Sequence, residues 1–166
     1  MALKDMRNLV FEGGGVRGIA YVGALQALAA RKVLPRVRRF CGASAGSITA
    51  WLCCYYKNKL EEIEKIQKKT DFKKFADDSW GIIRDSHRLL DRYGWHKGDK
   101  FYEWAQGITQ RRFKRSHITF QELFEETGNE LVVTGCNISQ GKTVLMSRQN
   151  TPDLFVERAL RISMSI

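Results

Sequence analysis

The sequence contains no apolar segment long enough to span a membrane. A spanning helix needs about 18 predominantly apolar residues in succession, and charged residues interrupt each apolar segment of this 166-residue chain before that length. The N-terminal segment, MALKDMRNLV, carries charges where a signal peptide would need its apolar centre. We therefore expect a cytoplasmic protein, or one delivered without a cleavable signal peptide.

Metal-binding and disulfide patterns are also lacking. The cysteines, Cys41, Cys53, Cys54 and Cys136, form no CxxC pair, and three of the four lie in apolar segments. No combination of His, Cys and carboxylate residues has the spacing of a metal site. We expect reduced, buried cysteines, no metal and no other cofactor.

Acidic residues are in deficit. The chain has 28 Lys and Arg against 18 Asp and Glu, and the resulting charge of +10 favours an anionic partner such as a lipid surface, a nucleic acid or an acidic protein. No nucleic-acid recognition module is present. Lys68–Phe75 and Gln110–Arg115 mix cations with phenylalanine, which suits an anionic lipid interface, although a solvated helix face explains either segment more simply. We expect peripheral membrane contact and no nucleic acid.

The remaining composition, with 43% hydrophobic and 11% aromatic residues, is that of a single globular domain over residues 1–166. Strand and helix patterns alternate, which predicts an α/β fold with a mostly parallel sheet flanked by helices. The expected strands are Asn8–Glu12, Val37–Cys41, Leu131–Asn137 and Thr143–Ser147; the expected helices are Ile19–Ala30, Ala45–Tyr56, amphipathic pieces between Lys57 and Arg115, a helix through Thr127 capped by Thr119 and Glu122, and a last helix from Thr151 to Ile162.

Glycine gathers in three segments that could carry chemistry. The first, EGGGVRG, fits G-x-G-x-x-G at Gly13, Gly15 and Gly18 between a strand and a helix, as a dinucleotide-binding loop does. Arg38–Arg39 lie at about the right distance for a phosphorylated ribose. A lone fingerprint is a weak signal, so a Rossmann unit is a minor alternative.

The second segment, GCNISQGKT, resembles a phosphate-binding Walker A loop. Five residues separate Gly135 from Gly141 where that loop has four, and the pattern that follows is a strand instead of a helix. A hairpin turn explains this segment better.

The third segment, GASAG, fits G-x-S-x-G at Gly42, Ser44 and Gly46, between a strand and a helix. In such a nucleophile elbow a tight, strained turn exposes the serine Oγ above the sheet, and flanking glycines prevent collisions across the turn. The alternative is a helix N-cap, in which Ser44 or Ser47 accepts hydrogen bonds from first-turn amides.

The first loop favours the elbow over the cap. Acyl transfer needs backbone donors for the charge that develops on the carbonyl oxygen, and a glycine run supplies them. Gly13, Gly14 and Gly15 leave the carboxyl end of the first strand, at the same edge of a parallel sheet where the second strand delivers Ser44. The N-terminus of the following helix adds its positive dipole end.

These residues resemble the patatin-like phospholipases, which are serine lipid acyl hydrolases. GGGVRG is similar to their oxyanion loop, and GASAG is similar to their nucleophile elbow. The segments Thr119–Ser147 and Thr151–Ile166 are similar to the later part of their domain. The resemblance implies Ser44 as the nucleophile of a Ser-Asp dyad and Gly13 to Gly15 as oxyanion donors. It implies a phospholipase A-type reaction on a phospholipid or another acyl-ester lipid. Arg17 would support the loop, or be a solvated first-turn residue.

The family's aspartate stands in an Asp-Gly-Gly or Asp-Gly-Ala motif, and neither motif occurs here. Asp153 falls in the first turn of an expected helix, where it suits the dipole, so it is not assigned as the base. The resemblance therefore implies the N-terminal part of a patatin-like catalytic domain, truncated before the aspartate segment. A catalytically silent lipid- or protein-binding module is the alternative.

A histidine-based triad is a minor alternative. His87, His96 and His117 lie in or beside charged helical segments, where surface or capping roles are the ordinary ones. The usual order of serine, acid and histidine would require His117 to pair with a residue such as Asp91 or Asp99.

Overall fold

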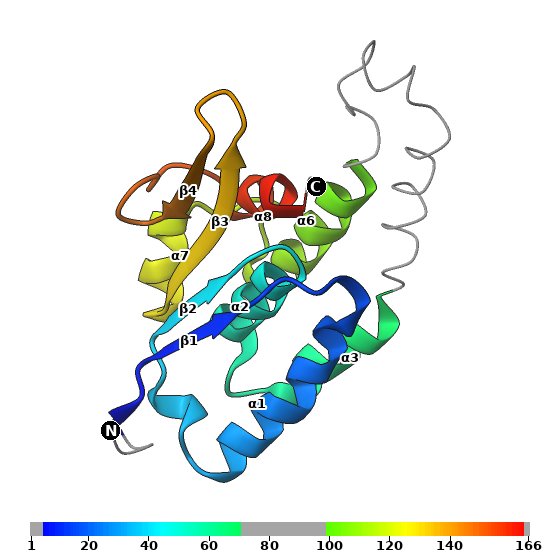
Figure 1. Cartoon of the computed structure of the whole chain (residues 1–166). Helices are drawn as coiled ribbons and strands as arrows, with labels where there is room; N and C mark the ends of the chain where they lie inside the picture. The colour runs from blue at the N-terminus through cyan, green and yellow to red at the C-terminus, as the bar shows by residue number, and fades with distance from the viewer. Residues whose placement is uncertain (1–4, 71–98, 165–166) are drawn as a thin grey trace.

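The computed structural model describes residues 5–70 and 99–164. The helical pieces predicted between residues 71 and 98, together with His87, His96 and Asp91, lie outside the described residues. Figure 1 shows the arrangement of the described elements, in which a twisted sheet runs beside a group of helices.

One four-stranded sheet organises the chain. Its order is β1 (Asn8–Phe11), β2 (Arg39–Gly42), β3 (Glu130–Asn137) and β4 (Lys142–Ser147). β1, β2 and β3 run parallel, and β4 pairs antiparallel with β3. The α/β fold with a mostly parallel sheet flanked by helices is thus confirmed. Because β1 and β2 are parallel neighbours, the loops that follow them leave from the same edge.

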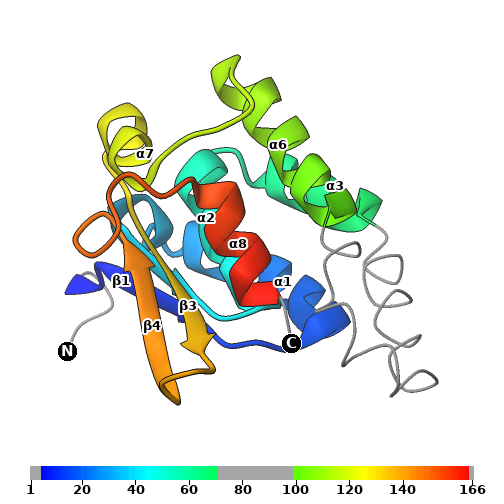
Figure 2. The ribbon, with the colours of Figure 1, turned by 90° about the horizontal axis from the view of Figure 1, so that it is seen from above.

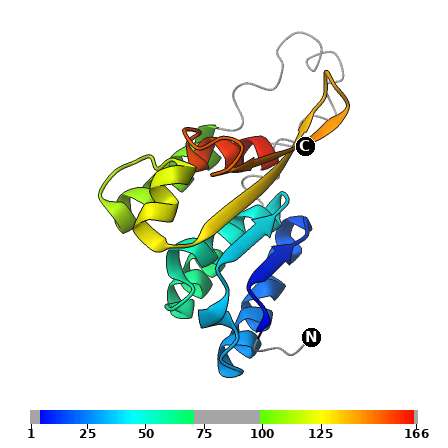
Figure 3. The same cartoon turned by 90° about the vertical axis from the view of Figure 1, so that its left-hand side faces the viewer.

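Two helices make the main contacts with the sheet. α2 (Ala45–Tyr56) packs against β1, β2 and β3, and α8 (Val156–Met164) packs against β3. Figure 2 shows α2 and α8 between the strands and the outer helices α3 and α6, and Figure 3 shows the β3–β4 hairpin extending from the sheet. The other helices are α1 (Ala20–Ala30), α3 (Leu60–Lys69), α6 (Asp99–Phe113) and α7 (Phe120–Thr127), with 3-10 turns at Gly15–Ile19 and Leu34–Arg36.

α2 is the centre of the core. Every residue from Ala45 to Tyr55 is buried, as its nearly uninterrupted apolar sequence predicts. Trp51 is fully buried, and its ring makes edge-to-face contacts with Tyr55 (5.0 Å between centroids) and Trp104 (5.9 Å). A large apolar side chain buried in this way contributes roughly 1.5–3 kcal/mol. α2 is therefore held by contacts on all sides.

Two local predictions are confirmed, and the predicted start of the last helix is wrong. The Thr119 and Glu122 capping box is present, and a turn with Gly141 at φ 59° joins β3 to β4 as a hairpin. α8 begins at Val156 instead of Thr151, because Thr151 caps the preceding turn by accepting a hydrogen bond from Ser147 N (3.1 Å). Asp153 therefore precedes the helix.

The cysteines are all free, but they are not all buried. Cys53 and Cys54 on α2 are buried, and burial raises the pKa of both thiols. Cys41 is half-buried and Cys136 is exposed. The expectation fails for Cys136 because alternate residues of β3 face opposite sides of the sheet.

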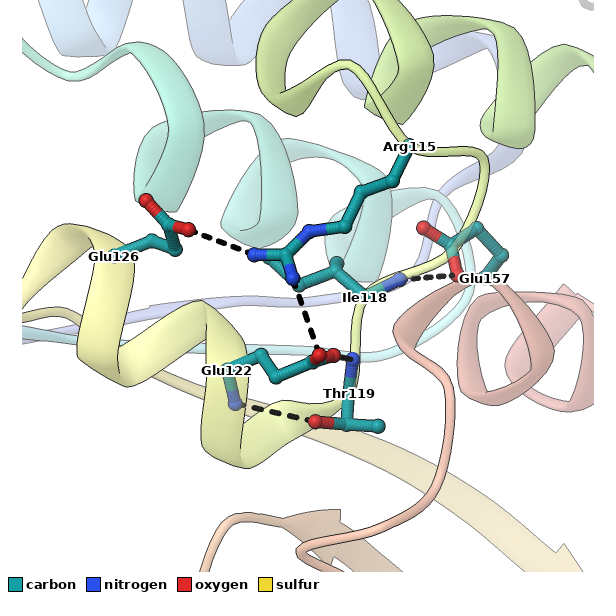
Figure 4. Close-up of polar contacts among 6 residues, drawn as sticks. All are labelled: Arg115, Ile118, Thr119, Glu122, Glu126 and Glu157. Carbon is teal, nitrogen blue, oxygen red and sulfur yellow. Dashed lines mark hydrogen bonds and ion pairs between the residues drawn. The ribbon is translucent and has the colours of Figure 1, made fainter.

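A buried carboxylate joins α6, α8 and the segment before α7. Glu157 has no exposed surface, and its oxygens accept hydrogen bonds from Thr109 Oγ1 (2.5 Å) and Ile118 N (3.4 Å). Figure 4 shows the Ile118 bond beside the capping box, where Arg115 bridges Glu122 and Glu126. Burial raises the pKa of Glu157. Relative to the unfolded chain, burial therefore makes the charged form of Glu157 less favourable.

This burial predicts a specific pH dependence of stability. A carboxyl group whose pKa is raised in the fold destabilises the folded state as pH rises from its unfolded pKa, near 4.5, through its folded pKa. We expect Glu157→Gln to gain stability relative to the natural protein as pH rises above about 4.5. Urea denaturation at several pH values measures the difference. His117 Nδ1 lies 3.9 Å from Glu157 Oε2. The comparison is therefore repeated in a His117→Gln background, which removes the imidazole next to this carboxyl group.

Glu122→Gln is the matched control, because its stability relative to the natural protein should change with pH in the opposite direction. The hydrogen bond from Thr119 N lowers the pKa of Glu122, so its contribution is present above about 4.5 and is lost as pH falls through the folded pKa. A Glu157→Gln variant whose stability follows the natural protein in parallel from pH 4.5 to 7 would contradict the account.

Candidate active site

The loops after β1 and β2 meet at the edge of the sheet. Phe11 and Gly42, the last residues of the two strands, are partners in the parallel register. A Cβ built on Gly13 would lie 3.3 Å from Ser44 Cβ, so the glycine loop lies against the serine. The proximity that the sequence predicts for these two loops is therefore present.

Ser44 has a strained backbone. Its φ of 49° and ψ of −126° are rare for a residue with a side chain, and such a conformation costs on the order of 1–3 kcal/mol. The turn is closed by hydrogen bonds from Gly46 N to Ala43 O and from Ser47 N to Ser44 O, both 2.8 Å. This is the conformation that a nucleophile elbow requires.

The N-cap alternative is wrong for both serines. The Ser44 side chain accepts no hydrogen bond from the first turn of α2. Ser47 lies within the helix, where its hydroxyl donates to Ser44 O (2.6 Å). Neither hydroxyl therefore satisfies the amides at the start of the helix.

Gly42 and Gly46 allow close backbone contacts around Ser44. A Cβ on Gly42 would lie 2.3 Å from Gly46 O, and a Cβ on Gly46 would lie 2.3 Å from Phe11 O. Both obstacles are backbone atoms, which cannot rotate away. The two glycines are therefore required by the crossing of β1, β2 and α2 at this point.

The glycine loop turns directly into a short helix. Gly15 has φ 54° and open space around it, and Arg17 N donates to Gly14 O (3.1 Å). The Arg17 side chain is exposed, so its supporting role stays a prediction. Gly18 lies against α2, since a Cβ there would be 3.5 Å from Ala45 Cβ. The Tyr21 hydroxyl donates to Glu12 O (2.9 Å) and ties the loop to α1.

The last turn of α8 also contacts the serine. Ser44 N donates to Ser163 Oγ (2.9 Å), and Ser44 Oγ lies 3.7 Å from Met164 Sδ. Sequence reasoning did not single out these two residues, which stand about 120 positions away. In the sequence, Ser163 is only a small polar residue near the end of an amphipathic helix, and this pattern does not predict a contact with Ser44.

No base for the serine is found in residues 5–70 and 99–164. The hydrogen bonds of Ser44 there involve Ser47, Ser163 and Met164, and neither an imidazole nor a carboxylate. His117 contacts Gln106 Nε2 at 3.1 Å instead. The same residues include no cluster of His, Cys, Asp and Glu that could hold a metal ion.

The helices in the described part of the chain are too short or too polar to cross a membrane.

The sequence model of the family described as "Patatin-like phospholipase" matches residues 9–166. This chain belongs to that family. A probable lipid hydrolase of Invertebrate iridescent virus 6 is 28% identical over 167 residues, covering 98% of this chain and 54% of the relative. An uncharacterized protein of Acanthamoeba polyphaga mimivirus is 26% identical over 162 residues, covering 97% and 52%. The chain thus spans about half the length of these relatives.

Solved structures of the same fold are similar over nearly the whole chain. ExoU, in its heterodimeric complex with SpcU from the type III secretion system of Pseudomonas aeruginosa, is 26% identical with a TM-score of 0.68, covering 96% of this chain and 36% of ExoU. Human GIVD cytosolic phospholipase A2, in complex with methyl gamma-linolenyl fluorophosphonate, has a TM-score of 0.57 at 15% identity, covering 99% and 30%. The latter likeness concerns the fold alone.

The glycine contacts predict a position-specific loss of stability. Gly46→Ala places a methyl group 2.3 Å from Phe11 O, so we expect it to lower the free energy of unfolding by about 3 kcal/mol or more. Gly23→Ala in α1 is the matched control, because its Cβ meets no atom within 4 Å and alanine gains roughly 0.5–1 kcal/mol in a helix. Urea denaturation followed by circular dichroism measures both. Equal stability of the two variants would refute the crowding at Gly46.

Proposed function

We propose that this protein is a lipid acyl hydrolase of the phospholipase A type, with Ser44 as its nucleophile. Family membership supports hydrolysis of a lipid. The observation that carries the residue assignment is the strained Ser44, at φ 49°, with Gly13 in van der Waals range of its Cβ. Residues 1–166 would form part of a single catalytic domain, whose substrate is a phospholipid or another acyl-ester lipid at a membrane surface.

The reaction begins with attack of Ser44 Oγ on the acyl carbonyl carbon. The C=O π bond opens as the Oγ–C bond forms, and the charge moves to the carbonyl oxygen, where amides of Gly13, Gly14 and Gly15 would donate to it. The base that takes the Oγ proton returns it to the ester oxygen, so collapse of this intermediate breaks the C–O ester bond, releases the lysolipid as an alcohol and leaves an acyl-enzyme. Water then attacks the acyl carbon and gives a proton to the same base, which passes it to Ser44 Oγ as the Oγ–C bond breaks and the fatty acid leaves.

The proton of Ser44 needs an acceptor. Ser44 has no carboxylate or imidazole partner among residues 5–70 and 99–164, and the chain has no Asp-Gly-Gly or Asp-Gly-Ala motif. We place the aspartate of a Ser-Asp dyad outside the 166 residues. The same observation favours the second candidate, a catalytically silent module that binds a lipid or a protein.

A fluorophosphonate probe separates these two functions. In the hydrolase, Ser44 Oγ attacks phosphorus and expels fluoride, so the intact mass of the protein at its natural length increases by a single adduct that maps to the Gly42–Ser47 peptide. We expect no adduct on Ser44→Ala, while Ser116→Ala, which removes an exposed serine beyond α6, still forms it. A folded natural protein without the adduct would favour the binding module.

Product analysis tests the reaction type. Phospholipid vesicles incubated with the natural protein should release free fatty acid and lysophospholipid, and Ser44→Ala should lower kcat by roughly 10³-fold or more, as removal of a serine nucleophile does. Release of diacylglycerol or a phosphorylated headgroup would identify cleavage at phosphorus and contradict the acyl-hydrolase assignment.

A further inference from the structure

The backbone amide of Ser44 is bound by another element of the fold. Within the turn, Gly46 N donates to Ala43 O and Ser47 N to Ser44 O, while Ala43 N donates to Phe11 O of β1. Ser44 N instead donates to the hydroxyl of Ser163, at 2.9 Å. Ser163 is only 5% exposed, so water does not readily replace this acceptor. The strained residue is therefore fixed in part by α8.

α8 is well suited to hold an atom in place. Its first turn carries Glu157, which accepts from Thr109 of α6, and Thr109 is in turn hydrogen-bonded to Tyr55 of α2 (2.9 Å). Along the helix Ala159 and Leu160 are fully buried. α8, which holds Ser44 N, is thus also linked through Thr109 to α2, the helix that follows Ser44. The backbone that carries the Ser163 hydroxyl therefore has little freedom to move.

The hydrogen bond has two consequences for chemistry. First, it gives Ser44 N an acceptor, and an unpaired amide at the buried start of a helix would be destabilising. Second, it occupies Ser44 N, so this amide is not free to donate to a carbonyl oxygen, and the oxyanion falls to other donors. An element that fixes the backbone of Ser44 also fixes the Cα–Cβ bond from which its Oγ projects.

We propose that Ser163 is a positioning residue for the nucleophile, holding Ser44 N so that Oγ faces the carbonyl carbon of the substrate. The inference rests on the proposed function of Ser44. Loss of the Ser163 hydroxyl should slow attack by Ser44 without removing it and without weakening substrate binding.

The test measures the rate at which Ser44 is labelled. In the protein at its natural length, we expect Ser163→Ala to lower the second-order rate of phosphonylation by about 10-fold, and kcat for lipid hydrolysis similarly with KM unchanged, because small displacements of a reacting atom are costly. Ser163→Thr keeps the hydroxyl and should restore most of the rate. Ser163→Cys is the substitute variant if Ser163→Ala does not fold. It keeps the shape of the side chain but has a weaker acceptor, so Ser44 in this variant should be labelled at a reduced rate.

Ser147→Ala is the matched control. Ser147 is also a buried serine whose hydroxyl accepts from a backbone amide, that of Asn150 (3.4 Å), but it lies at the end of β4. We expect its labelling rate to equal that of the natural protein. A general loss of packing would slow both variants, whereas a positioning role slows only Ser163→Ala.

The outcomes distinguish the two proposals. If the natural protein is labelled at Ser44 and Ser163→Ala and Ser163→Cys are labelled at the same rate, the positioning role is overturned and the hydrolase stands. If the natural protein is not labelled at all, the proposed function fails and the positioning role fails with it. Slower labelling of Ser163→Ala with recovery in Ser163→Thr supports both.

Discussion

The architecture of the site depends on two backbone contacts that leave no room for a side chain. Gly46 lies where a Cβ would be 2.3 Å from Phe11 O, and Gly42 where a Cβ would be 2.3 Å from Gly46 O. Because β1, β2 and the start of α2 approach one another this closely, the chain turns from strand to helix within Ala43 and Ser44. That sharp turn forces Ser44 to a positive φ and brings it against the glycine loop.

Burial of α2, the helix that follows Ser44, offsets the cost of the strained backbone. α2 is buried through eleven consecutive residues, from Ala45 to Tyr55, and packs on three of the four strands. Unfavourable geometry at one residue, on the order of 1–3 kcal/mol, is small beside that burial. Ser44 thus stands at the start of a rigid element, as preorganised chemistry requires, and the oxyanion donors proposed for it would come from a loop whose position the same sheet determines.

Local features were predictable from the sequence, and distant contacts were not. The bounds of α2, the capping box at Thr119 and the closeness of the glycine loop to Ser44 all follow from residue types at short spacing. The contact of Ser44 with Ser163 depends on how α8 packs on β3, which no local pattern encodes. The exposure of Cys136 and the late start of α8 likewise depend on tertiary neighbours.

We propose that the glycine loop supplies the oxyanion donors for attack by the strained serine. The most direct measurement is a crystal structure of the natural protein with a phosphonyl group on Ser44. We expect Ser44 to keep its positive φ and a phosphonyl oxygen to lie about 2.7–3.1 Å from backbone amides of the Gly13–Gly15 loop. A phosphonyl oxygen that accepts no hydrogen bond from this loop, or a Ser44 that relaxes to a negative φ, would contradict it.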